Sequence, residues 1–316
     1  MFDALAFAIA IVFPNLALMG LGFFMHKRAM IDGHFIDVAS KLVFNVGLPC
    51  LLFLSVVKSD VNFSEQITLI GAGVATTFGL FFGAEIYAKF FVPNLPDKGV
   101  FVQGVFRSNM AIISLSVVAN AYGAVGTSVG AVYMGLLTIL YNVLSVITLS
   151  RTQAGNLSAQ SRAIVIKIFT NPLIVALLLA FVYQGLGLPL PPAPIIKTGE
   201  LLASIALPLA LICAGATLDV KSMLGLTGVS MQASLGRAVV APVCAVLVGV
   251  VFDLSAVQFG VLFIMVSSPA AAASYVMAKA MGGNDVLAAN ILAFTTLASM
   301  FSLAFGMTLL RMLAWV

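Results

Sequence analysis

The sequence predicts an all-α integral membrane protein with ten transmembrane helices in two inverted five-helix repeats, in which the broken helices 4 and 9 cross. Three observations lead to this fold class. Hydrophobic residues make up 62% of the 316 residues and charged residues only 8%, which excludes an ordinary soluble domain. About ten apolar stretches are long enough, at roughly 20 residues each, to cross a bilayer as helices. The two halves of the chain also match at a constant offset.

The expected helices follow one another with short connections. We place them at residues 3–25, 36–57, 66–88, 99–121, 125–149, 166–185, 199–218, 225–251, 256–279 and 285–313. The alternating pattern of a membrane β-barrel is absent. The polar stretch 151–162 is expected to be a cytoplasmic linker between a first repeat at 1–150 and a second at 163–316. The proline-rich stretch 188–194 is expected to be an extended connection.

The internal repeat depends on landmarks that lie 159 residues apart. In the first and second half these are Pro49 and Pro208, residues 107–109 and 266–268, and Gly123 and Gly282. Hydrophobic segments interrupted at matching places in two halves indicate the binding site of a secondary transporter. Because each half has five segments, the second half enters the membrane in the opposite orientation.

The basic residues indicate how the chain is oriented. With the N-terminus outside, nine Lys and Arg residues fall in inner loops and three on the outer side, so both termini are expected outside. The nine are Lys27, Arg28, Lys89, Lys98, Arg151, Arg162, Lys167, Lys221 and Lys279. Because these charges are scattered over short loops, nucleic acid is not expected as a partner.

Polar residues interrupt the fourth and ninth segments near their centres, at Arg107-Ser108-Asn109 and Ser267-Ser268-Pro269. Ser and Asn favour the position before a helix, and Pro favours the first helical position. We therefore expect Ser108 or Asn109 to cap a half-helix that starts at Met110, and Ser268 to cap one that Pro269 opens.

These interruptions predict a site for an organic anion. Helix N-termini carry partial positive charge, and Arg107 adds a full charge. Burying an arginine at this depth costs roughly 2.5–3.5 kcal/mol, so a charge within a membrane segment usually lines a functional site. Asn142 and Asn290, on the fifth and tenth segments, are expected to face the crossing or to bridge helices. The alternative is a simple kink with serines bonded back to their own helix, and for the ninth segment alone we favour it.

Other polar residues leave alternatives open. Glu85 and Lys89 lie four apart on one helical face, where they either neutralise each other or form a proton-sensitive gate. Arg237, within the eighth segment, is interpreted first as an interface or packing charge. Hydrolase and nucleotide-binding motifs are absent from the sequence, so we expect neither an enzyme nor a cofactor or metal, apart from a coupling proton or sodium ion.

Two stretches resemble the auxin efflux carrier family. Residues 45–53, Asn-Val-Gly-Leu-Pro-Cys-Leu-Leu-Phe, resemble its N-x-x-L-P-x-x-L-F signature, and residues 102–109 resemble its crossing segment. The resemblance spans essentially the whole chain. It implies a homodimeric carrier of small organic anions in a bacterial inner membrane that works by an elevator movement.

The resemblance also implies roles for individual elements. Helices 1, 2, 6 and 7 would form a scaffold that holds Pro49 and Pro208, and helices 3–5 and 8–10 would form the transport unit. Plant relatives carry an acidic residue four before a lysine on helix 3, as Glu85 and Lys89 do. Relatives commonly have a proline at the helix-4 crossing, which this chain lacks. A sodium-coupled symporter of bile-acid-carrier type and a non-transporting anion sensor are the alternatives.

Overall fold

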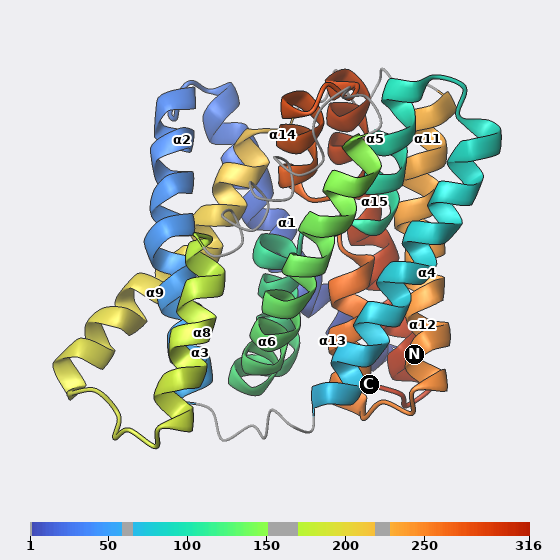
Figure 1. The fold of residues 1–316 in the computed structure, drawn as a ribbon. Helices are drawn as coiled ribbons and strands as arrows, with labels where there is room; N and C mark the ends of the chain where they lie inside the picture. Colours follow the sequence, from blue (N-terminus) through green and yellow to red (C-terminus); the bar gives the residue numbers. More distant parts are fainter. Residues whose placement is uncertain (1, 59–65, 151–169, 219–227) are drawn as a thin grey trace.

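The computed structural model describes residues 2–58, 66–150, 170–218 and 228–316 (Figure 1). Over these ranges every regular element is a helix, and seven helical stretches are long and apolar enough to cross a membrane. The predicted all-α membrane fold is therefore confirmed. Seven is fewer than the ten predicted segments, because the fourth and ninth are interrupted and the sixth begins beside residues that are not described. The predicted linker at 151–162 lies outside the described residues.

The helices carry the labels of Figure 1. In chain order they are α1 (Phe2–Lys27), α2 (Gly33–Leu42), η1 (Val43–Gly47), α3 (Leu48–Val57), α4 (Ile67–Phe91), α5 (Leu95–Phe106), η3 (Met110–Ser114), α6 (Leu115–Leu149), α8 (Pro172–Gly185), α9 (Ala193–Ala216), α11 (Gly228–Leu235), η5 (Gly236–Val240), α12 (Ala241–Val251), α13 (Ala256–Ser267), α14 (Ala272–Ala280) and α15 (Asp285–Met312). The η elements are π-helical turns, and each continues into the α-helix that follows it.

Helix α9 begins earlier than the sequence predicts. It starts at Ala193, with Pro194 in its first turn, whereas the expected segment began at 199. A proline in the first turn loses no hydrogen bond, since the N–H groups there have no partner within the helix. The prediction that all of 188–194 is extended is therefore wrong for its last two residues.

Two glycines with positive φ mark sharp turns in the two halves. Gly123 has φ 60° and ψ −142° and divides α6, while Gly282 has φ 72° and separates α14 from α15. Glycine adopts this region without steric cost. These are the two glycines that match in the repeat, so the matched positions share a positive φ as well as a residue type.

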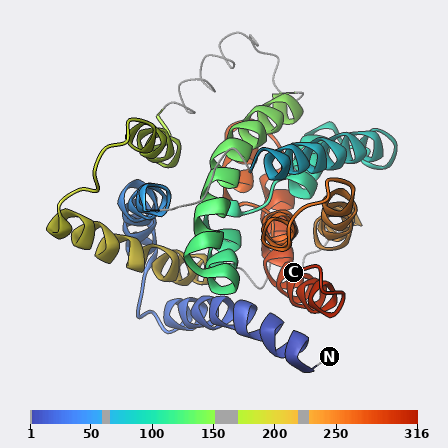
Figure 2. The same ribbon diagram turned by 90° about the horizontal axis from the view of Figure 1, so that it is seen from below.

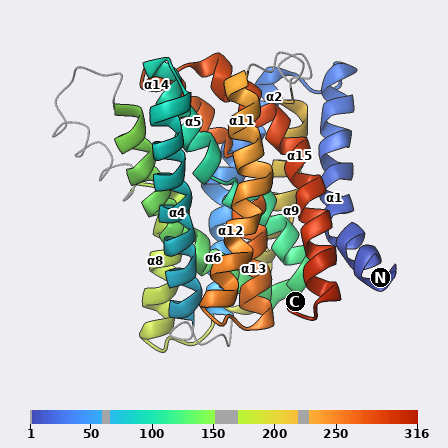
Figure 3. The ribbon, with the colours of Figure 1, turned by 90° about the vertical axis from the view of Figure 1, so that its right-hand side faces the viewer.

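The helices pack in two groups with α6 between them (Figure 2). In the first group α1 packs on α9, and α3 packs on both α8 and α9. In the second group α4, α5 and α11–α15 pack on one another, and α15 also lies along α1. Both chain termini lie at the same end of the bundle (Figure 3).

Helices α1 and α9 approach until their backbones touch. A Cβ atom added at Gly22 would overlap the carbonyl oxygen of Ile212, and one added at Gly215 would overlap that of Met19. Glycine is what allows helix backbones to come this close in a membrane, where lipid supplies no hydrophobic drive for association. This contact fixes α1 on α9.

Candidate binding site at the crossing of two interrupted helices

Two extended segments cross where α5 and α13 end. Helix α5 ends at Phe106 and α13 at Ser267, and the residues that follow form an antiparallel bridge between Ser108 and Ala270. The Asn109 N–H donates to the Pro269 carbonyl at 2.8 Å, and the Ala271 N–H donates to the Arg107 carbonyl at 3.1 Å. Each interrupted helix thus satisfies backbone groups that the other leaves without a partner. Both interruptions lie where the sequence predicted them.

The predicted serine cap of the second half-helix is wrong. Helix α14 starts at Ala272 instead of Pro269, with Ala271 at the cap position and no side-chain cap. The Ser268 hydroxyl donates to the Ile264 carbonyl at 2.9 Å, one turn back on α13. Serines in membrane helices commonly bond in this way, and here the extended pairing delays the restart of the helix.

The side-chain cap predicted at the first restart is also wrong. Asn109 occupies the cap position before η3, but its side chain makes no capping hydrogen bond. Its carbonyl instead accepts from both the N–H and the hydroxyl of Ser114, each at 3.1 Å. The Ser108 hydroxyl lies 3.2 Å from the hydroxyl of Tyr141, so it bonds across to α6.

Arg107 lies in the crossing with 6% of its surface exposed. Its Nη1 donates to Ser145 Oγ at 2.9 Å and to Met277 Sδ at 2.7 Å, and its Nη2 donates to Asn142 Oδ1 at 2.7 Å. All three partners are neutral. Among the residues that the structure describes, the ion pairs are those of Glu200 with Lys58 and Lys197, so no carboxylate there neutralises Arg107.

Asn142 accepts a hydrogen bond from Arg107 and therefore faces the crossing, which was one of the two alternatives expected from the sequence. Ser145 and Met277 were missed. Ser145 lies three residues beyond Asn142 and therefore on the same face of α6, which is a signal that the sequence contained. Met277 belongs to α14, and nothing in its local sequence marks it as a partner of Arg107.

The other predicted site residues differ in their surroundings. Ser267 is fully buried, and its hydroxyl has no hydrogen-bond partner among the described residues. Pro269 contributes its carbonyl to the crossing, as described above. Asn290 is buried on α15, one residue before Ile291, whose side chain lies against Gly104 of α5. No contact joins Asn290 to Arg107 among the described interactions.

Helix α4 supplies Glu85 and Lys89. The Thr148 hydroxyl of α6 donates to Glu85 Oε1 at 2.7 Å. Lys89 is exposed, and its ammonium lies 5.7 Å from the centroid of the Phe90 ring. Glu85 is thus joined to the helix that also holds Arg107, while Lys89 points outward. The gating role of this pair stays a prediction.

The two predicted scaffold prolines belong to helices that pack on each other. Pro49 stands in the first turn of α3, directly after η1, and Pro208 lies inside α9. A Cβ added at Gly47 would lie 3.0 Å from the Cβ of Ala206, so η1 and α9 are in close contact near both prolines.

Arg237 is a second buried charge, and the sequence pattern did not predict it as a site residue. It has no exposed surface and lies in the π-helical turn η5. Its Nη1 donates to the Val105 carbonyl at 2.8 Å, near the end of α5, while its Nε and Nη2 have no partner among the described residues. Its position at the middle of an apolar segment was the available signal, because such charges usually serve a function.

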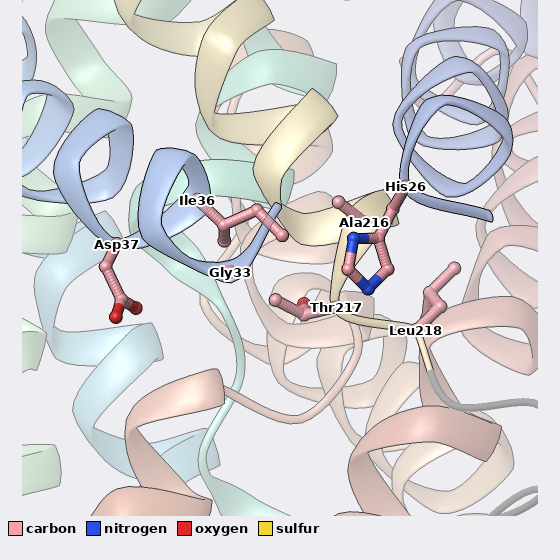
Figure 4. A pocket seen from close by; sticks show the side chains of 7 residues that line it. All are labelled: His26, Gly33, Ile36, Asp37, Ala216, Thr217 and Leu218. Carbon is pink, nitrogen blue, oxygen red and sulfur yellow. The ribbon is translucent and has the colours of Figure 1, made fainter. Parts of the chain in front are cut away.

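Two cavities bear on the site. A small one of about 10 Å³, enough for one water, lies beside the crossing. Gln103 Oε1 and Ser274 Oγ line it, and neither has a hydrogen-bond partner among the described residues. A larger one of about 520 Å³ lies between the ends of α1, α2 and α9, where His26, Asp37 and Thr217 line it (Figure 4). No residue of the crossing lines the larger cavity.

A family model described as a membrane transport protein (Mem_trans) matches residues 7–307, nearly the whole chain. No curated protein sequence matches the chain at a significant level.

Proposed function

Because the chain belongs to this membrane transport family, that of the auxin efflux carriers, we propose that it is a secondary active transporter of small organic anions, namely mono- or dicarboxylates. The observation that carries the proposal is Arg107. Its charge lies in the crossing, enclosed and held only by neutral groups among the described residues. A buried guanidinium without a counter-charge is costly, and an anionic substrate would supply that charge.

The substrate carboxylate would lie between the starts of η3 and α14. The first N–H groups of a helix have no partner within it and carry partial positive charge. We propose that Arg107, Ser108, Asn109 and Ser267 surround this position together with the backbone of Ser268 and Pro269, and that Asn142, which accepts a hydrogen bond from Arg107, orients it. We propose Asn290 as a further contact, supported by its burial on α15.

The proposed architecture is ten transmembrane helices in two inverted repeats. The matched interruptions and the positive φ of both Gly123 and Gly282 support it. So does the packing, because an inverted repeat relates α1 to α8 and α3 to α9, and the α1–α9 and α3–α8 contacts are then equivalent. Both termini lie at one end of the bundle, which agrees with an even number of membrane-spanning helices.

The proposed movement is that of an elevator. Helices α1, α2–α3, α8 and α9 would form the fixed scaffold, which contains Pro49 and Pro208. The remaining helices would carry the substrate across the membrane. We further propose a homodimer in a bacterial inner membrane with both termini outside. A proton acting through Glu85, or a sodium ion, would couple the movement to an ion gradient; no resident cofactor is proposed.

Counterflow of labelled succinate and butyrate into proteoliposomes tests this proposal. We expect saturable exchange of at least one of these acids, reduced at least tenfold in Arg107→Gln, because hydrogen bonds to charged groups contribute about 1.5–3 kcal/mol. Arg311→Gln is the matched control, since Arg311 is exposed at the end of α15 and should leave exchange unchanged. Binding without exchange would identify an anion sensor, and exchange that is unaffected in Arg107→Gln would remove Arg107 from the site.

A further inference from the structure

Arg237 has a free hydrogen-bonding edge inside the protein. Its Nη1 donates to the Val105 carbonyl at 2.8 Å, while its Nε and Nη2 have no partner among the described residues. In a guanidinium group the N–H of Nε and one N–H of Nη2 lie on the same edge and point in parallel toward one acceptor. The two unsatisfied donor atoms of Arg237 are therefore the pair that a single acceptor can bind at once.

Two hydroxyl groups beside Arg237 also lack hydrogen-bond partners within the described ranges. Tyr133 of α6 interacts electrostatically with Arg237, and its hydroxyl is one of the two. The other belongs to Ser234, three residues before Arg237 and so on the same side of the helix. None of the three side chains has exposed surface. All four atoms can donate a hydrogen bond, so this group of side chains lacks an acceptor.

Glu85 is the carboxylate that the structure brings to α6, and its position favours Arg107 over Arg237. The Thr148 hydroxyl that donates to Glu85 lies one turn beyond the α6 serine that holds Arg107. Tyr141, the α6 neighbour of Arg237 that is nearer to Thr148, lies seven residues before it, about 10 Å along the helix axis. Glu85 therefore offsets the charge of Arg107 in part and leaves that of Arg237.

We propose that the free edge of Arg237 binds a resident inorganic anion, chloride, at a site separate from the substrate position. Chloride accepts several hydrogen bonds at once and supplies the missing negative charge, which a water molecule does not. Arg237 lines neither of the two cavities described above, and an enclosed position of this kind suits a monatomic ion better than a carboxylate substrate. The bound ion holds Arg237 against the Val105 carbonyl and so stabilises the carboxyl end of α5, next to the crossing.

A purely structural role of Arg237, as a cap on the carboxyl end of α5, has different consequences. The stability of a protein with a simple cap responds to ionic strength but not to the identity of the anion. A chloride site makes stability depend on the anion at constant ionic strength, and the dependence saturates.

The experiment measures thermal unfolding in detergent at constant ionic strength, while chloride replaces gluconate, an anion too large for the site. The apparent melting temperature of the wild-type protein should rise with chloride and level off. At ten times the dissociation constant the rise should be about 2–4 °C. Bromide should act like chloride.

Two variants separate the anion site from the cap. Arg237→Gln, which keeps an amide donor for Val105, should melt at the same temperature in chloride and in gluconate. Tyr133→Phe should raise the dissociation constant for chloride about tenfold, since a hydrogen bond to a charged group is lost. The matched control is Tyr122→Phe, which removes another buried hydroxyl without a partner among the described residues. It should leave the chloride effect unchanged, because Tyr122 interacts with Arg311 instead.

A crystal grown in sodium bromide provides a second measurement that needs no variant. The anomalous peak of bromide is expected beside Nε and Nη2 of Arg237 and the hydroxyl of Tyr133. The inference is overturned if this position has no peak, or if chloride shifts the wild-type protein and Arg237→Gln equally. Neither result bears on the proposed function, which carboxylate counterflow tests separately.

Discussion

Replacing Gly22 with alanine tests the contact on which the proposed scaffold depends. The new Cβ would overlap the carbonyl oxygen of Ile212 and lie 2.7 Å from its carbonyl carbon and 2.9 Å from its Cα. Non-bonded carbon atoms prefer separations of about 3.5–4.0 Å, so α1 and α9 must move apart by about 1 Å. The obstructing atoms belong to the backbone, and no change of rotamer can relieve them.

The expected cost of Gly22→Ala lies near the upper end of the range for overpacking, about 3 kcal/mol. The matched control is Gly20→Ala on the same helix, where an added Cβ meets nothing within 4 Å. It should be neutral or stabilising by up to about 1 kcal/mol, because alanine favours a helix. A thermal unfolding series in detergent, read by size-exclusion chromatography, should place Gly22→Ala roughly 5 °C or more below the control.

The reciprocal variant sharpens this test. A Cβ at Gly215 would overlap the carbonyl oxygen of Met19, so Gly215→Ala forces apart the same pair of helices. The double variant should therefore cost less than the sum of the single ones, since one separation relieves both overlaps. Equal melting temperatures for Gly22→Ala and Gly20→Ala would refute the reasoning.

Three further predictions concern single polar side chains. Asn15→Ala should cost about 1–2 kcal/mol in thermal stability, because Asn15 Oδ1 accepts from Ser116 at 2.9 Å and from Asn120 at 3.2 Å and so joins α1 to α6; a change within error would contradict this. Ser268→Ala should leave succinate affinity within about twofold, since the hydroxyl bonds to the Ile264 carbonyl of its own helix, and a tenfold loss would restore the capping interpretation. Glu85→Gln should flatten the pH dependence of counterflow if Glu85 carries the coupling proton, and an unchanged profile would eliminate that role.

The sequence was most informative where polar residues interrupt its apolar segments. Arg107-Ser108-Asn109 and Ser267-Ser268-Pro269 stand out because charged and hydrogen-bonding groups are costly within a span, and the helices do end at these residues. Gly123 and Gly282 were visible for a related reason, as glycines in register between two apolar halves.

The details of the crossing were not accessible in this way. Whether Ser268 caps α14 or bonds to Ile264 depends on how far the extended pairing continues, and its partner segment lies about 160 residues away in the sequence. Met277 holds Arg107 through a contact between α14 and the crossing, and Arg237 reaches the end of α5 from another helix. Such contacts are properties of the packed bundle, and no local pattern encodes them.

The most direct test of the central claim is to locate a bound dicarboxylate. Bromosuccinate carries an anomalous scatterer, so a crystal structure of its complex would place the ligand by a bromine peak. The account predicts this peak at the crossing, within reach of the Arg107 guanidinium and the first residues of η3 and α14. A peak in the larger cavity instead, beside His26 and Thr217, would contradict it.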